Sequence, residues 1–237
     1  MKLALALLLV LFWIVLASDC FFILNGDSEY RYYTKPLLMS ILYIIVALET
    51  VDTTHKRSKL IITFAILFSL GGDLLLLYDS NKSYFTFGLL CFLLVHILYA
   101  VFFFRLKRFS LKRVGPILIG LVLITGYLYF FLNLIWTRIV EDGFDIQIIA
   151  YSVASAIMFL AAINTVNGRR AKRAGWLNFV PGAILFIISD SLLGVAKFYT
   201  FVNPPKELLP ALNSAVMFTY GGAQMLIISG AIKFIKK

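Results

Sequence analysis

The stretch LIITFAILFSLGGDLLLLY, residues 60–78, carries one charged side chain, Asp73, among mostly apolar residues. Its length is close to the ~20 helical residues needed to cross the ~30 Å hydrocarbon core of a bilayer. The rest of the chain has the same character, because 61% of its 237 residues are hydrophobic and only 14% are charged. A soluble domain is about half apolar and a quarter charged, so this composition excludes a water-soluble fold.

Apolar runs of similar length recur along the whole sequence. They show no sustained two-residue alternation, which disfavours a transmembrane barrel and favours helices. We therefore predict an all-α, polytopic membrane helix bundle of about eight transmembrane helices, forming a single transmembrane domain over residues 1–237. A signal peptide is the alternative for the first run, but the apolar residues continue past Cys20 to Leu24, so a retained helix is expected. The predicted spans are 3–24, 36–51, 60–78, 85–104, 114–136, 145–164, 177–199 and 211–232.

The charges between the runs predict the orientation, because Lys and Arg concentrate in the cytoplasmic loops of membrane proteins. With eight spans, 16 Lys and Arg residues fall on the side of both termini and 6 on the opposite side. Both termini are therefore expected in the cytoplasm. The net charge of +10 is then a consequence of topology, and no nucleic-acid partner is expected. Short loops and compact size favour a bacterial inner membrane.

Among the ionisable residues inside the apolar runs, three stand out: Asp73, His96 and Asp190. Such a side chain near mid-membrane costs ~2.5–3.5 kcal/mol on insertion scales, so each is a functional candidate. Both aspartates are expected in the non-cytoplasmic half of the membrane. The interval of 23 residues from Asp73 to His96 equals that from Asp190 to Asn213, which suggests a 4+4 parallel pseudo-repeat with the site between its halves.

The eighth run carries a polar stripe. Asn213, Met217, Tyr220 and Gln224 are spaced so that they share one helix face, and unpaired amides avoid lipid, so the stripe should face the bundle. It could equally serve as hydrogen-bonding glue between helices. Lys35 opens the second helix, where it could bind a ligand or merely extend to the interface.

The polar residues of these helices form an ordered set from the second run to the eighth. They are Lys35-Pro36, Gly72-Asp73, Gly88, His96, Tyr99, Ser189-Asp190, Asn213, Tyr220 and Gln224. Their order and spacing resemble the YhhN family, the membrane-protein family that contains the animal lysoplasmalogenases. The resemblance implies hydrolysis of the vinyl ether bond of lysoplasmalogen, a lysophospholipid, to a fatty aldehyde and glycerophosphoethanolamine or glycerophosphocholine.

The candidate residues suit this chemistry. A vinyl ether is cleaved by proton delivery to carbon followed by water addition, and two carboxyls in a low-dielectric site can supply a neutral acid beside an ionised partner. We therefore predict Asp73 and Asp190 as a catalytic pair in one shared pocket. His96, Tyr99 and Tyr220 are predicted to support them.

Lys35 is predicted to hold the lipid phosphate, with Ser189, Asn213 and Gln224 as further substrate-binding residues. No cofactor is expected, and no metal, because Asp73, Asp190 and His96 have no recognisable ligand spacing. The alternative function is a small proton-coupled transporter, or a lipid-binding or lipid-translocating membrane protein, using the aspartates as proton-coupling groups.

Overall fold

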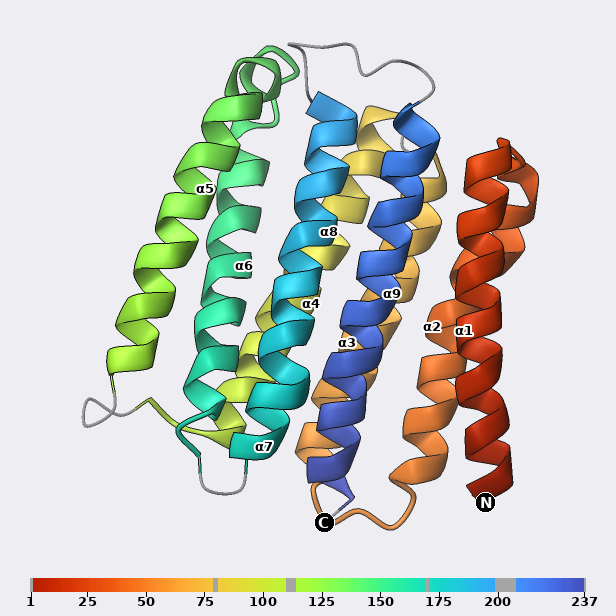
Figure 1. Cartoon of the computed structure of the whole chain (residues 1–237), viewed down its shortest axis with the longest axis vertical. Coiled ribbons are helices and arrows are strands. Elements are labelled where there is room, and N and C mark those ends of the chain that lie inside the picture. The colour runs from red at the N-terminus through yellow and green to blue at the C-terminus, as the bar shows by residue number, and fades with distance from the viewer. Residues whose placement is uncertain (1, 79–80, 110–113, 169–170, 199–207, 237) are drawn as a thin grey trace.

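The computed structural model describes residues 2–78, 81–109, 114–168, 171–198 and 208–236. These residues form helices without a strand (Figure 1). The elements are α1 (Lys2–Asn25), η1 (Ser28–Tyr30), α2 (Arg31–Glu49), α3 (Lys56–Leu75), η2 (Leu76–Tyr78), α4 (Lys82–Leu106), α5 (Gly115–Glu141), α6 (Asp145–Thr165), α7 (Lys172–Ala174), the π-helix η4 (Gly175–Phe179), α8 (Val180–Phe198) and α9 (Leu208–Ile235).

Within the described residues, eight helical segments are long and apolar enough to cross a membrane. This confirms the predicted all-α bundle, and the chain is an integral, multi-pass membrane protein. α7, η4 and α8 form one continuous span over Lys172–Phe198. Both termini lie at the same end of the bundle, which we call the terminal end, and the opposite end is called the far end (Figure 1).

The orientation of this bundle relative to the cytoplasm stays a prediction, as does the pseudo-repeat. Some of the cations on which the orientation depends lie outside the described residues. These are Lys112, Arg113, Arg169, Arg170, Lys206 and Lys237.

The second helix begins earlier than its apolar run. α2 starts at Arg31, because the polar residues 31–34 extend the helix beyond the apolar stretch that hydropathy detects. Lys35 therefore does not open the helix, as the sequence suggested, but lies within it, and Pro36 is an interior residue. Lys35 is also 5% exposed, so it points into the bundle and not to the interface.

The helices differ in how central they are. α9 lies near the middle of the bundle and packs against α1 and α8, and 61% of its apolar window is buried. α5 lies at the outer edge, packs mainly against α6 and α8, and has only 17% of its window buried (Figure 1). Most of α5 is therefore left for contact with lipid.

Glycines bring α3 and α4 close together. A Cβ on Gly72 would lie 2.7 Å from Cε2 of Phe92, and a Cβ on Gly88 would lie 2.7 Å from Cδ2 of Leu76. Membrane helices use small residues in this way to let their backbones approach. The close approach sets the position of α4, which carries His96.

Gly72→Ala is expected to lower the free energy of unfolding by about 1–3 kcal/mol, because the added methyl overpacks the α3–α4 contact. Gly126→Ala is the matched control, since a Cβ there would meet nothing within 4 Å. Thermal unfolding in detergent should show a lower midpoint for the first variant alone. Equal midpoints would contradict the close approach.

Candidate active site

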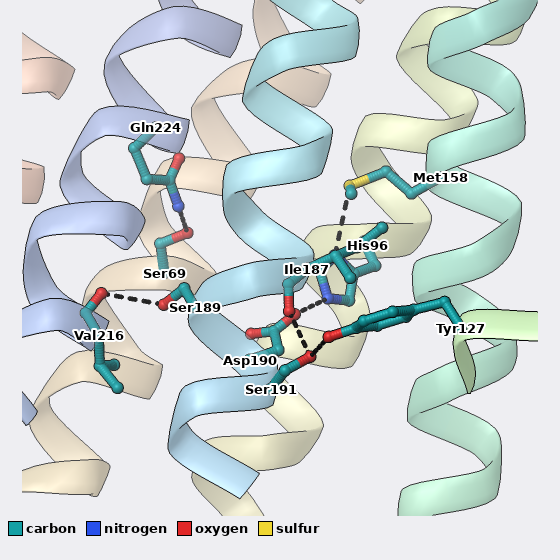
Figure 2. A network of polar contacts seen from close by, with 10 residues as sticks. All are labelled: Ser69, His96, Tyr127, Met158, Ile187, Ser189, Asp190, Ser191, Val216 and Gln224. Atoms are coloured by element: carbon teal, nitrogen blue, oxygen red, sulfur yellow. Dashed lines mark hydrogen bonds and ion pairs between the residues drawn. The ribbon is translucent and has the colours of Figure 1, made fainter. Parts of the chain in front are cut away.

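A hydrogen-bonded pair, Asp190 on α8 and His96 on α4, lies inside the bundle (Figure 2). Nε2 of His96 lies 3.0 Å from Oδ2 of Asp190. On the other side of the ring, Nδ1 lies 3.3 Å from the sulfur of Met158 on α6. The His96 side chain is fully buried, whereas 19% of the Asp190 side chain is exposed. The pair thus joins three helices and is accessible only at its carboxyl end.

The sulfur contact bears on the tautomer of His96. A thioether sulfur only accepts hydrogen bonds, so a hydrogen bond at this contact needs a proton on Nδ1 of His96. In that tautomer Nε2 presents a lone pair, and its contact with Asp190 needs one further proton, on either Asp190 or Nε2. A pair that holds this proton is neutral overall, and it avoids the cost of a net charge in the membrane.

Asp190 lines a pocket between α4, α5, α6 and α8, with a cavity volume of about 50 Å³. Among the described lining residues Asp190 is the one charged side chain, and most of the others are apolar. The other polar lining residues are Tyr151, Ser152, Ser155 and Ser191. The arrangement presents a single acid to an apolar ligand.

Tyr151 on α6 completes the surroundings of the carboxyl. Its hydroxyl hydrogen-bonds the Asp190 side chain, and its ring meets the His96 ring edge-on, with centroids 4.9 Å apart. The sequence analysis did not identify Tyr151, because a tyrosine inside an apolar run is not distinguishable from a core aromatic residue.

A second polar group surrounds Asp73, between α2, α3 and α9. The Tyr220 hydroxyl donates a hydrogen bond to Oδ2 of Asp73 at 2.9 Å. Nζ of Lys35 lies 3.7 Å from Oδ1 of the same carboxyl, and both side chains are buried. A buried ion pair of this kind is maintained because each charge compensates the desolvation of the other.

Gln224 links this group to α3 and α4. Its amide donates a hydrogen bond to the Ser69 hydroxyl at 2.9 Å (Figure 2), and its carbonyl accepts one from the Tyr99 hydroxyl. Gln224, Ser69 and Tyr99 are each fully buried. The polar stripe of the eighth span therefore faces the bundle, as predicted, and here it connects helices.

The other two residues predicted to bind substrate lie on α8 and α9. The Ser189 hydroxyl donates a hydrogen bond to the backbone carbonyl of Val216 at 3.0 Å, which ties α8 to α9 (Figure 2). Asn213 is half-buried, one turn before Met217 on α9. Neither residue lines the pocket at Asp190.

The two groups are neighbours, but they do not form one pocket. The ring of Phe186 lies 4.7 Å from the ring of His96 and 5.7 Å from that of Tyr220, centroid to centroid. Asp73 is not among the described residues that line the pocket at Asp190. The structure thus does not bring the two carboxyls to a shared pocket, because packed aromatic rings separate their partners. Across the described ranges, no three His, Cys, Asp or Glu side chains are placed to hold a metal ion.

A further buried carboxyl, Asp19 on α1, was not singled out from the sequence. The Thr34 hydroxyl donates a hydrogen bond to its Oδ1 at 2.5 Å, and Nε of Arg31 lies 3.7 Å from the same oxygen. The available signal was an acid inside an apolar run that continues to Leu24.

These features define a class of protein: a membrane-embedded helix bundle that holds an acid–imidazole pair at an apolar pocket. The chain belongs to the YhhN family, whose family model matches residues 30–231. α1 with Asp19 lies outside this match.

Curated relatives cover most of the chain. The lysoplasmalogenases of Mycobacterium bovis and Mycobacterium tuberculosis are each 26% identical over 199 residues, which is 83% of this chain and 69% of the relative. Lysoplasmalogenase TMEM86A of Bos taurus is 30% identical over 184 residues, covering 76% of this chain and 68% of the relative. No solved structure gives a significant match.

Proposed function

We propose that this protein is a membrane hydrolase that cleaves the vinyl ether bond of lysoplasmalogen, giving a fatty aldehyde and glycerophosphoethanolamine or glycerophosphocholine. Membership of the YhhN family and relatives named lysoplasmalogenase support a lysoplasmalogenase-like hydrolase acting on ether lipids. The observation that carries the proposal is the contact of Asp190 with His96 at an apolar pocket, where the pair would supply the proton for cleavage.

In the proposed reaction the pair first acts as an acid. Asp190 transfers the shared proton to the vinyl carbon farther from the ether oxygen, which leaves an oxocarbenium ion. The pair then carries one negative charge, which stabilises the cation beside it in a low-dielectric site. Tyr151, through its hydroxyl, stabilises the carboxylate that forms.

The pair then acts as a base. Water adds to the carbon bonded to the ether oxygen and gives one proton to the Asp190–His96 pair, which restores its neutral state. The hemiacetal breaks its bond to the glycerol oxygen, with transfer of the hydroxyl proton to that oxygen, and releases the aldehyde. One water is consumed, and the pair ends with the proton with which it began.

Asp73 is proposed as a second carboxyl that acts indirectly, from the neighbouring group. It compensates the charge of Lys35 and accepts a hydrogen bond from Tyr220, whose ring packs on Phe186 beside His96. In this proposal Asp73 positions the catalytic histidine.

The four residues predicted to bind the substrate fall into two groups. Lys35, Ser189 and Gln224 already hold buried partners on other helices, so we assign them to supporting the bundle. The half-buried Asn213 is retained as a candidate for lipid contact.

For the membrane orientation, we propose that the terminal end faces the cytoplasm of a bacterium. The excess of Lys and Arg in the loops on that side supports this orientation. Asp190 lies eight residues before the far end of α8, or ~12 Å along the helix. The site would then lie in the non-cytoplasmic half of the inner membrane.

The direct test uses purified protein in detergent with 1-alkenyl, 1-alkyl and 1-acyl lysophospholipids, followed by measurement of aldehyde release. Only the alkenyl lipid should release aldehyde. In D₂O the aldehyde, trapped at once by reduction, should carry one deuterium at carbon 2, because the first step protonates that carbon. Uptake of intact lipid into vesicles without cleavage would support the transporter alternative and reject the hydrolase.

Tyr151→Phe is expected to slow aldehyde release by about 10–100-fold, because hydrogen bonds to charged groups contribute about 1.5–3 kcal/mol. The substitution keeps the ring against His96, so the thermal unfolding midpoint should change little. Tyr129→Phe is the control, since Tyr129 is 74% exposed on α5. Unchanged turnover of Tyr151→Phe would remove this hydroxyl from the mechanism.

A further inference from the structure

The seam between α5 and α8 contains two adjoining pockets. The first is the pocket at Asp190. The second lies on the side of the terminal end and is lined by Leu123, Ile124, Tyr127, Phe159, Ile184, Ile187 and Ile188. Ile187 lines both pockets, so they lie next to each other along α8.

One face of α8 runs through both pockets. Its residues at 184, 187, 191, 194 and 198 alternate by three and four positions, which places them on one side of a helix. The character of the side chains changes along this face. It is wholly aliphatic at Ile184 and Ile187, polar at Asp190 and Ser191, and aromatic at Phe198.

Cations lie at the far end of the seam. Nζ of Lys197 lies 4.8 Å from the ring centroid of Phe85, which lines the Asp190 pocket. Nζ of Lys82 lies 5.1 Å from the ring of Phe144, which packs edge-on against Phe85. From the far end of the bundle toward the terminal end, the seam thus presents two lysines, then Asp190, and then an aliphatic pocket.

We propose that this seam binds a single-chain ether lysophospholipid lengthwise, with its phosphate at Lys197, its ether carbon at Asp190 and the middle of its chain in the aliphatic pocket at Ile184. The placement rests on the proposed function and specifies how the substrate lies. Lys197 and Asp190 are seven residues apart on α8, or ~10 Å, which the glycerol backbone and the flexible Lys197 side chain can span together. Ile184 is six residues from Asp190 on the other side, or ~9 Å, which is about half of an extended hexadecyl chain. Because α5 is the least buried span, the lipid enters sideways from the bilayer.

Tyr127 and Ser191 lie where the two pockets meet. The Tyr127 hydroxyl donates a hydrogen bond to the Ser191 hydroxyl at 2.6 Å, across the seam (Figure 2). The Tyr127 ring is stacked on Phe131, which lines the pocket at Asp190. A chain that continues beyond Asp190 passes this pair, so Tyr127 is a specificity-determining residue for chain length.

The first test is photolabelling with two 1-O-hexadecyl lysophospholipids, which lack the vinyl double bond and are not cleaved. One carries a diazirine next to the ether and the other at the middle of the chain. We expect the first to label Tyr151 or Ser155 and the second to label residues 123–127 and 184–188. Mid-chain adducts on α2, α3 or α9, around Asp73, would overturn the placement.

The second test measures binding of the same uncleaved lipids to variants. Leu123→Trp narrows the aliphatic pocket and should weaken hexadecyl lipid binding by about tenfold or more, which is the contribution of two buried methylenes. Binding of a butyl lipid, whose chain is too short to fill that pocket, should stay unchanged. Val122→Trp is the matched control, because Val122 is similarly exposed on α5 and lines neither pocket. An equal loss in both variants, or no loss in either, would overturn the proposal.

A third variant tests the phosphate end. Lys197→Met should weaken binding of the hexadecyl lysophospholipid by about tenfold and leave binding of hexadecyl glycerol, which has no phosphate, unchanged. Equal effects on the two lipids would overturn the assignment of Lys197. If wild-type protein releases no aldehyde from alkenyl lipid but labels as expected, the hydrolase proposal fails and the placement stands. If it releases aldehyde but labels elsewhere, the placement alone fails.

Discussion

Asp190→Asn is expected to reduce aldehyde release by about 10²–10⁴-fold, the usual contribution of a general acid–base group. The amide has nearly the same shape and can still hydrogen-bond Nε2 of His96, but it has no acidic proton to give to carbon. The loss should appear in single-turnover measurements, and the deuterium label at carbon 2 should fall with it.

Glu141→Gln is a matched control for Asp190→Asn, since it makes the same change of group on a side chain that is 57% exposed. Both variants should unfold at the wild-type temperature, because neither removes a packed group. Wild-type turnover in Asp190→Asn would exclude this carboxyl as the proton donor, whatever the effect of substituting Asp73.

Asp73→Asn is expected to act mainly on stability, lowering the free energy of unfolding by about 3–5 kcal/mol. The substitution removes the carboxylate that lies 3.7 Å from the buried ammonium of Lys35, and with it the attraction between the two charges. Lys35→Met should be destabilising for the converse reason. The measurement is the thermal unfolding midpoint in detergent, together with the yield of folded protein.

The double variant Lys35→Met, Asp73→Asn separates the two possible roles of Asp73. If Asp73 serves by compensating Lys35 and positioning His96, the double variant should recover most of the stability and a substantial part of the turnover. A double variant that is stable but releases no aldehyde would instead show that the Asp73 carboxyl acts in the chemistry. That outcome would require the Asp73 carboxyl and the Asp190–His96 pair to come together when lipid binds.

The sequence predicts the number of spans well because membrane insertion is a property of single segments. Each run of about 20 apolar residues satisfies its own backbone hydrogen bonds as a helix, whatever its neighbours do. Helix ends are less predictable, as at Arg31, because polar residues can extend a helix beyond the hydrocarbon core. The π-helix at Gly175–Phe179, just before Pro181, likewise leaves no mark in hydropathy.

The candidate site is only partly predictable for a different reason. The energetic cost of an ionisable group in lipid identifies Asp73, His96 and Asp190 individually. It does not say which helices are neighbours, and that arrangement decides that His96 meets Asp190 while Asp73 meets Lys35. The contacts of Tyr151 depend on the packing of α6 against α4. The hydropathy of a single apolar run does not reveal this packing.

A neutral Asp190–His96 pair, as proposed for the resting protein, would respond little to the membrane potential. A potential of 100 mV acts on each elementary charge with about 2.3 kcal/mol, but a pair whose charges cancel experiences little net force. Its protonation at rest is therefore expected to be nearly independent of voltage. Charge separates within the bilayer only during turnover of a lipid. Loss of the membrane potential should therefore not change the protonation of the resting pair.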